Sequence, residues 1–164
     1  MRRIRLLSLA LLLPALACGP AEDAGTMAAV DTAAVQTALD SFRLRYIAAE
    51  TAGDAAGLAA LYDENAGIDL YGLPRLRGRA NIQAAFQGMF ATRKVTVFEI
   101  MPTSMEARTN SDASELGTYH TLADSSGVKL HEWGRYLVAF TKGSDGQWRL
   151  VYLIGFSDST KVEK

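Results

Sequence analysis

The sequence predicts an α+β domain in which helices cover one face of a curled antiparallel sheet. Three observations lead to this fold class. Apolar residues in the N-terminal half recur every three or four positions, which is the period of a helix. From about Lys94 onward, apolar and polar residues alternate, which is the period of a strand. Helices that come first, followed by an uninterrupted run of strands, are typical of α+β folds.

The first 17 residues (1–17) are predicted to be a secretion signal. Three arginines precede an apolar run of 12 residues, Leu6 to Ala17, which is too short to cross a bilayer because that takes about 20 residues. The only cysteine, Cys18, follows this run and resembles the acylated cysteine of a bacterial lipoprotein. Ala15-Leu16-Ala17 also fits an ordinary signal-peptidase site. We expect a membrane-anchored lipoprotein of the bacterial cell envelope, with its lipid on Cys18.

Residues 18–31 are expected to form a flexible tether, because they are mostly small or polar and show no periodicity. Removing the three N-terminal arginines from the 17 Lys and Arg residues leaves 14, against 18 Asp and Glu residues. No cluster of basic residues remains in this part of the chain. The composition therefore argues against nucleic-acid binding, and any membrane contact is expected through the lipid anchor only.

Three helices are expected in the first half of the domain. The first runs from about Thr32 to Ala52 and ends at Gly53. Asp54 can cap a second helix. The apolar residues of this second helix are Leu58, Leu61 and Tyr62. A short strand over residues 66–71 and a loop rich in Gly, Pro and Arg precede a third helix, which begins at about Arg79.

Four strands are expected after the helices. They run from Val95 to Ala107, from Ala113 to Ala123, from Val128 to Thr141 and from Gln147 to Ser157. Short clusters of turn-forming residues separate them. The domain is therefore expected to span residues 32–158, followed by a C-terminal tail over residues 159–164.

Hairpin register predicts which side chains lie under the helices. A turn at Ser125-Ser126 would pair Tyr119 with Glu132, and the apolar pattern of the last hairpin favours a pairing of Val138 with Leu150. With this register the inner face carries Tyr119, Glu132, Tyr136, Val138, Tyr152 and Ile154. The outer face carries an apolar patch of Leu137, Ala139, Val151 and Leu153. A contiguous apolar patch usually marks an interface, so a homodimer through these four residues is expected.

Several short runs, in this order and spacing, match a known family. They are Arg45 to Asp54, Leu58 to Tyr62 with Glu64 to Ala66, Leu76 to Arg79 with Ile82 and Phe86, Gly134-Arg135-Tyr136, and Asp145 to Arg149. Together they resemble the nuclear transport factor 2-like superfamily, in its SnoaL-like and ketosteroid-isomerase-like branch. The resemblance implies a cone-shaped curved antiparallel sheet, with three N-terminal helices packed on its concave face and a pocket at the mouth of the cone.

The resemblance also bears on catalysis. Steroid isomerases of this superfamily use a tyrosine of the first helix, and Tyr46 occupies that place. Their aspartate base aligns with Leu70, while the adjacent Asp69 is expected on the opposite face of the strand. The acid that assists the tyrosine aligns with Tyr136. The resemblance therefore implies no complete catalytic set, and the candidate catalytic residues are Tyr46, Asp69 and Glu132.

We expect an exported domain that binds a small apolar or amphipathic molecule in an apolar pocket. The expected pocket residues are Tyr46, Leu70, Tyr119, Glu132, Tyr136, Val138, Tyr152 and Ile154. Two alternatives remain open: an isomerase, dehydratase or hydrolase that uses Tyr46 with Asp69 or Glu132, and a non-catalytic dimeric assembly module. No cofactor and no metal site are predicted, because His120 and His131 face each other across a hairpin without a third ligand.

Overall fold

The computed structural model describes residues 29–163, which form three helices and a six-stranded sheet. The helices are α1 (Thr32–Ala52), α2 (Ala55–Ala60) and α3 (Arg79–Thr92). The strands are β1 (Tyr62–Leu70), β2 (Leu76–Arg77), β3 (Lys94–Ala107), β4 (Asp112–Ser125), β5 (Val128–Lys142) and β6 (Trp148–Glu163). The predicted signal and Cys18 lie outside the described residues. No helix within residues 29–163 is long and apolar enough to cross a membrane.

The bounds of α1 follow from local interactions at its two ends. The side chain of Asp31 accepts a hydrogen bond from the backbone N–H of Ala34 at 2.9 Å, which satisfies one of the free donors of the first turn. Gly53 ends the helix in a left-handed conformation with φ of 67°, which glycine adopts without steric cost. Asp54 then caps α2 by accepting a hydrogen bond from the N–H of Gly57 at 2.8 Å.

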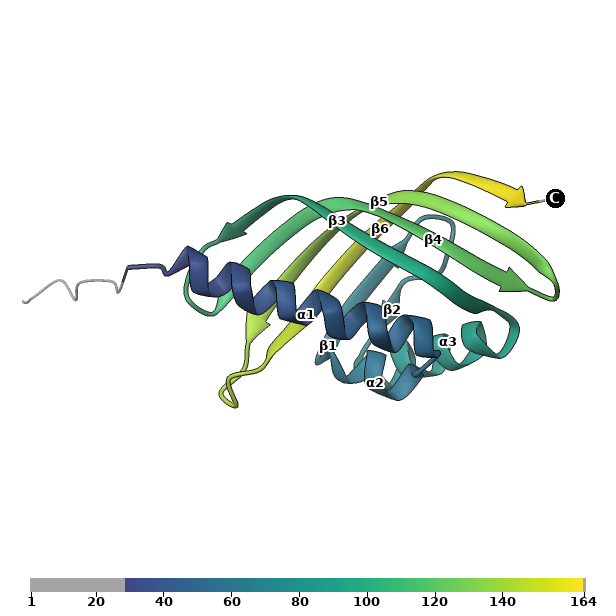
Figure 1. Cartoon of the computed structure of the whole chain (residues 1–164). Helices are drawn as coiled ribbons and strands as arrows, with labels where there is room; N and C mark the ends of the chain where they lie inside the picture. The colour runs from purple at the N-terminus through teal and green to yellow at the C-terminus, as the bar shows by residue number, and fades with distance from the viewer. Residues whose placement is uncertain (1–28, 164) are drawn as a thin grey trace, which may run out of the picture.

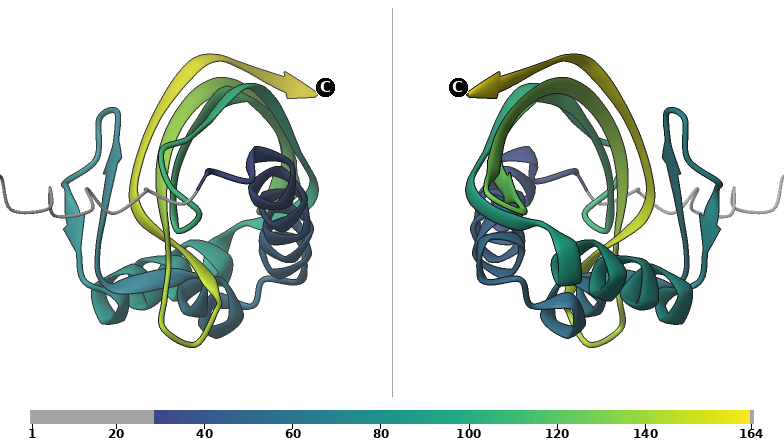
Figure 2. Two further views of the ribbon diagram at one scale, coloured as in Figure 1. Left: turned by 90° about the vertical axis from the view of Figure 1, so that its left-hand side faces the viewer. Right: turned by 90° about the vertical axis from the view of Figure 1, so that its right-hand side faces the viewer.

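The strands follow the order β2-β1-β6-β5-β4-β3. All neighbouring strands are antiparallel except β1 and β6, which pair in parallel. Figure 1 shows the long strands arching over α1. Figure 2 shows that the sheet curls around a space that the three helices border on the remaining sides. The predicted α+β fold, with helices on one side of a curved sheet, is confirmed. The short strand β2 lies in the segment that was expected to be a loop.

The apolar stripe of α1 packs on the concave face of the sheet. Leu39 and Phe42 are almost fully buried, and the ring of Phe42 meets Phe140 of β5 edge to face, with ring centroids 5.2 Å apart. The core extends to α2, α3 and the neighbouring strands through Leu58, Tyr62, Ile82 and Leu150. The space between the helices and the sheet is thus filled mainly by aromatic and aliphatic side chains.

Two predicted boundaries are wrong. Leu61 is the C-terminal cap of α2 and Tyr62 is the first residue of β1, so α2 is shorter than the sequence suggested. Residues 159–163, expected to be a tail, continue β6 and pair with residues 129–133 of β5. The backbone N–H and C=O groups of the long strand β5 take their partners from this extension, which explains why it is part of the sheet.

The hairpin between β4 and β5 turns one residue later than predicted, at Ser126 and Gly127. Both residues have positive φ values, 56° and 82°, as in the two-residue turns that match the twist of a hairpin. Moving the turn by one residue shifts every pair by two, so that Tyr119 faces Gly134 rather than Glu132. An even shift keeps each side chain on its predicted face. The predicted faces of β4 and β5 are therefore correct although their pairs are not.

A bulge in β6 has a larger effect. Phe140 pairs with Leu150 and the preceding residue Ala139 pairs with Tyr152, so Val151 is an extra residue between two consecutive pairs. A single inserted residue reverses the alternation of every residue beyond it. The predicted register of the last hairpin is therefore wrong, and from Tyr152 to Ser157 the face of each β6 side chain is the opposite of the expected one.

Beyond the bulge, Leu153 lies on the concave face, whereas Tyr152 and Ile154 lie on the convex face. The predicted dimer surface is wrong for Leu153, and the extra residue Val151 interrupts it. Leu137 and Ala139 do lie on the convex face, between side chains that point inward. A homodimer through the convex face stays a prediction, now without Leu153.

The close approach of strands at Gly117 makes a prediction about stability. A Cβ atom there would collide with the carbonyl oxygen of Met101 and with the ring of Tyr136. We expect Gly117→Ala to lower the free energy of unfolding by about 2 kcal/mol, because the backbone of β3 must shift to make room. Urea unfolding of the wild-type protein and of Gly117→Ala is the measurement, and Gly88→Ala in α3 is the control.

At Gly88 a Cβ atom would meet no heavy atom within 4 Å. Alanine is the better helix former by about 1 kcal/mol, so Gly88→Ala should raise the stability slightly. The close approach would be contradicted if Gly117→Ala were as stable as the wild-type protein.

Candidate functional site

A cavity of about 180 Å³ lies between α1, α3 and the concave face of the sheet. Its walls are mostly aromatic and aliphatic, and they include Phe42, Phe86, Phe98, Ile100 and Leu150. Apolar cavities of about 150 Å³ can hold a benzene molecule. The space is therefore suited to a molecule built around one ring or to an aliphatic molecule of similar size.

Six of the eight predicted pocket residues line this cavity. They are Tyr46, Leu70, Tyr119, Glu132, Tyr136 and Val138. Tyr152 and Ile154 do not line it, because the bulge at Val151 turns them to the convex face. Leu153 and Gly155 of β6 take their places in the cavity wall.

Asp69 is excluded as a base within the cavity. Its carboxylate accepts a hydrogen bond from Arg75 at 2.6 Å and another from the hydroxyl of Tyr152. The hydrogen bond from Arg75 is the main reason that the pKa of Asp69 lies below its usual value, and the one from Tyr152 acts in the same direction. The neighbouring Leu70 faces the cavity instead. The alternation of the strand therefore holds at this position, and Asp69 lies outside the cavity.

Two phenols meet at the cavity wall. The hydroxyl oxygens of Tyr46, from α1, and Tyr62, from the start of β1, lie 2.9 Å apart. Burial is the main reason that the pKa of each is raised above the usual value for tyrosine, so both stay protonated at neutral pH. In such a pair one hydroxyl donates to the other, and the proton of the second remains for another acceptor.

Glu50 and Arg93 line the same cavity but were not among the predicted residues. Glu50 lies on α1 one turn beyond Tyr46 and is only 7% exposed. Burial raises the pKa of Glu50 to about 7, although the charge of Arg93 acts in the opposite direction. A signal for Glu50 was present in the sequence, since a charged residue four positions after Tyr46 falls on the apolar stripe.

Arg93 directly follows α3, and its guanidinium group reaches the cavity. It donates a hydrogen bond to the hydroxyl of Thr121 at 3.0 Å and lies 3.6 Å from a carboxylate oxygen of Glu132. Among the described residues, neither Oε2 of Glu50 nor Nε of Arg93 has a hydrogen-bond partner, although both atoms are buried. Buried polar atoms in native proteins nearly always have partners, so this pair calls for an explanation.

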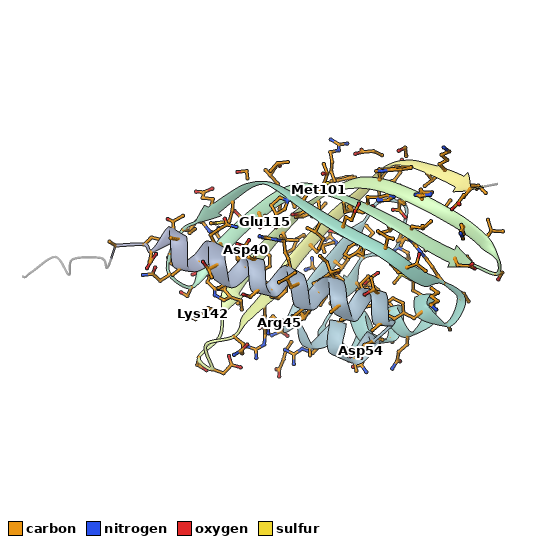
Figure 3. The ribbon with its side chains drawn as sticks, viewed as in Figure 1. Asp40, Arg45, Asp54, Met101, Glu115 and Lys142 are labelled. Carbon is orange, nitrogen blue, oxygen red and sulfur yellow. The ribbon has the colours of Figure 1, made fainter. Side chains whose placement is uncertain are left out.

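The other two carboxylates of the cavity are already engaged. Glu132 accepts a hydrogen bond from the hydroxyl of Tyr119 at 2.7 Å. Glu115 accepts one from the hydroxyl of Tyr136 at 2.8 Å and forms an ion pair with Arg43. Figure 3 shows Glu115 above the N-terminal half of α1, close to the label of Asp40 and far from that of Asp54. The group around Glu115 lies toward one end of the helix, and Glu50 lies toward the other.

The two histidines lie on the convex face, away from the cavity. Nε2 of His120 is 3.0 Å from Nδ1 of His131, and Nδ1 of His120 is 2.9 Å from a carboxylate oxygen of Glu99. The indole of Trp133 stacks against both rings. Within residues 29–163, no group of three or more His, Cys, Asp and Glu side chains is placed to hold a metal ion.

The raised pKa of Glu50 makes stability depend on pH. The folded state holds the Glu50 proton more tightly than the unfolded chain, whose glutamates have a pKa of about 4.3. This contribution is therefore fully present below about pH 4 and is lost as the pH rises through 7. Between pH 5 and pH 8, we expect the free energy of unfolding of the wild-type protein to fall by about 2–3 kcal/mol relative to that of Glu50→Gln.

Urea unfolding at the two pH values measures this difference. Glu64→Gln is the matched control, because Glu64 is an exposed carboxylate on β1. The raised pKa of Glu50 is contradicted if the free energies of unfolding of Glu50→Gln and Glu64→Gln change with pH in the same way as that of the wild-type protein.

Solved structures share this fold at low sequence identity. A ketosteroid isomerase-like protein from Erwinia carotovora atroseptica SCRI1043 matches with a TM-score of 0.68 and 14% identity, over 75% of this chain and 95% of that one. A hexachlorocyclohexane dehydrochlorinase (LinA) of type 2 matches with a TM-score of 0.71 and 12% identity, over 80% and 90%. A putative scytalone dehydratase from Novosphingobium aromaticivorans DSM 12444 matches with a TM-score of 0.70 and 14% identity, over 80% of this chain and 89% of that one.

At these identities the likeness shows the fold alone. No curated protein matches the chain. The family of SnoaL-like domains matches residues 44–151, which cover the end of α1, all of α2 and α3, and the sheet up to the start of β6. Because this match spans more than half of the chain, the protein belongs to the SnoaL-like domain family.

Proposed function

We propose that this protein binds one small, mostly apolar molecule in the cavity between the helices and the sheet. The observation that carries the proposal is the cavity itself, about 180 Å³ in volume, with apolar walls and a few convergent polar groups. Binding sites for small molecules typically combine these two features. The polar groups would orient the molecule, and the aromatic walls would supply most of the binding free energy.

A second candidate function is proton transfer on that molecule, as in an isomerase, dehydratase or hydrolase. Glu50 favours it, because a carboxyl group with a pKa of about 7 can both take up and release a proton near neutral pH. The hydroxyl pair of Tyr46 and Tyr62 could stabilise negative charge that develops on an oxygen atom. Glu50 would then act where Asp69 was expected, and Glu132 would keep its hydrogen bond from Tyr119.

The two functions differ in what happens to the bound molecule. A catalyst of proton transfer would exchange a carbon-bound hydrogen of the molecule for deuterium in D₂O, and the exchange would depend on Glu50. A binding protein would release the molecule with its mass unchanged.

We expect a cavity-filling substitution to abolish binding. Leu153→Trp places an indole in the cavity wall, whereas Leu137→Trp adds the same group on the convex face, where Leu137 is 45% exposed. Native mass spectrometry of protein purified from its own host is the measurement. The wild-type protein and Leu137→Trp should carry an additional small mass that Leu153→Trp lacks.

Circular dichroism would verify that both variants are folded, since overpacking costs about 1–3 kcal/mol. A bound mass that persists in Leu153→Trp, or is missing from all three proteins, would count against the proposal.

We also propose where the protein is located, and this proposal rests on its sequence alone. A basic start, a short apolar run and the single Cys18 support export and lipid anchoring in the bacterial cell envelope. The several acyl chains of a lipoprotein hold a domain at a membrane far more firmly than one chain does.

Replacing the predicted acylation site tests this anchoring. We expect Cys18→Ser to move the protein from the membrane fraction to the soluble fraction, because the acylated thiol is lost. Fractionation and the mass of the processed N-terminus are the measurements. Sedimentation with membranes and an unchanged processed mass would show that Cys18 is not the anchor.

A further inference from the structure

Two buried atoms without partners belong to side chains that line the cavity, and they are of two complementary kinds. Nε of Arg93 is a donor and can never accept a hydrogen bond, because the guanidinium group stays protonated. Oε2 of Glu50 is an acceptor whenever the carboxyl group is ionised. Leaving such atoms without partners is unfavourable, and more so for charged groups. A ligand that supplies both missing hydrogen bonds would remove both costs.

The charges around this pair restrict the ligand. The positive charge of Arg93 is already opposed by Glu132, whose carboxylate lies 3.6 Å away, and by the Glu50 carboxyl when that is ionised. An anion would satisfy Arg93 but would meet two carboxyl groups. A cation would satisfy Glu50 but would meet the guanidinium group. The other polar groups at this end of the cavity, Thr121 and the phenols, carry no charge at neutral pH.

Resting on the binding function proposed above, we infer that the ligand is a neutral, ring-sized alcohol whose hydroxyl group bonds to both Glu50 and Arg93. The hydroxyl oxygen accepts from Nε of Arg93, and its proton goes to Oε2 of Glu50. The apolar remainder of the molecule lies against the aromatic walls. The cavity of about 180 Å³ has room for a single ring with a short substituent.

A hydroxyl group suits this pair better than a carbonyl group does. A carbonyl oxygen can only accept, so it satisfies Arg93 but leaves an ionised Glu50 without a partner. A hydroxyl group can donate to the ionised carboxylate and can accept from the protonated one. With the pKa of Glu50 at about 7, both states are populated near neutral pH, and the alcohol is suited to each.

Four probes that share one ring separate the possibilities: toluene, benzyl alcohol, benzoate and benzylamine. Isothermal titration calorimetry of the full chain at pH 7 measures their affinities. In an apolar cavity without a partner, the hydroxyl of benzyl alcohol would weaken binding relative to toluene, because its buried polar group costs free energy. With both hydrogen bonds formed, benzyl alcohol should bind about 10-fold more tightly than toluene, and the two charged probes should bind more weakly than either.

Substitutions then locate the effect. Glu50→Met should abolish the preference for benzyl alcohol over toluene, while Glu50→Gln should keep it, because an amide both donates and accepts. Arg93→Met should likewise abolish the preference for benzyl alcohol over toluene. Arg93→Met also removes the charge that opposes Glu132, so the comparison of the four probes on the wild-type protein decides the question if this variant fails to fold. Glu64→Met, on the exposed part of β1, is the matched control and should keep the preference.

The outcomes separate this inference from the function on which it rests. If toluene binds as tightly as benzyl alcohol, the inference is overturned and water satisfies the pair, but the binding function stands. Tightest binding of benzoate or benzylamine would also overturn it. If neither neutral probe binds, the proposed function fails together with the inference. Tenfold tighter binding of benzyl alcohol, lost in Glu50→Met and kept in Glu64→Met, supports both.

Discussion

The packing of α1 on the concave face of the sheet is the interaction on which the rest of the structure depends. A curved sheet buries its concave face only if something fills the curve, and one helix with an apolar stripe does so here. In the first part of the stripe Leu39 is fully buried, and the ring of Phe42 meets Phe140 of β5 directly and also begins the cavity wall. Toward the end of the helix the stripe continues with Tyr46 and then Glu50, and here the cavity lies between helix and sheet.

The polar groups of the cavity show two different ways of burying a carboxylate. Glu115 is held by Arg43 and by a phenol, so its buried charge is partly compensated within the protein, although burial still raises its pKa above the usual value. Glu50 has no such partner among the described residues, and burial alone dominates its pKa. Compensated groups serve the fold, because removing one partner leaves a buried charge behind. An uncompensated group costs stability, and that cost is typical of positions that serve binding or chemistry.

The fold itself does not decide between binding and catalysis, because one fold hosts many functions. The position that aligns with the base of the steroid isomerases holds Leu70, and the nearest carboxylate, Asp69, is bonded to Arg75 on the other face. Among the residues that the structure describes, the only buried carboxylate oxygen without a hydrogen-bond partner is instead Oε2 of Glu50, on α1. Any chemistry in this cavity would therefore start from the helix and not from the first strand.

What the sequence determined by itself is local. The bounds of α1 follow from Asp31 and Gly53, whose capping roles need only the neighbouring turn. The faces of β4 and β5 follow from strict alternation, which survives a shift of the turn by two residues. The order of short motifs indicated the family, because their spacing reflects the lengths of the elements between them.

What only the tertiary structure decided depends on contacts between distant parts of the chain. The bulge at Val151 is a shift in the pairing of β6 with β5, and because the residues on both sides of it are apolar, no local pattern marks it. It alone moved Leu153 into the cavity and Tyr152 out of it. Glu50 and Arg93 are 43 positions apart and come together only because α1 and α3 border the same cavity. Sequence patterns report the faces of single elements, and the meeting of two such faces is a property of the packing.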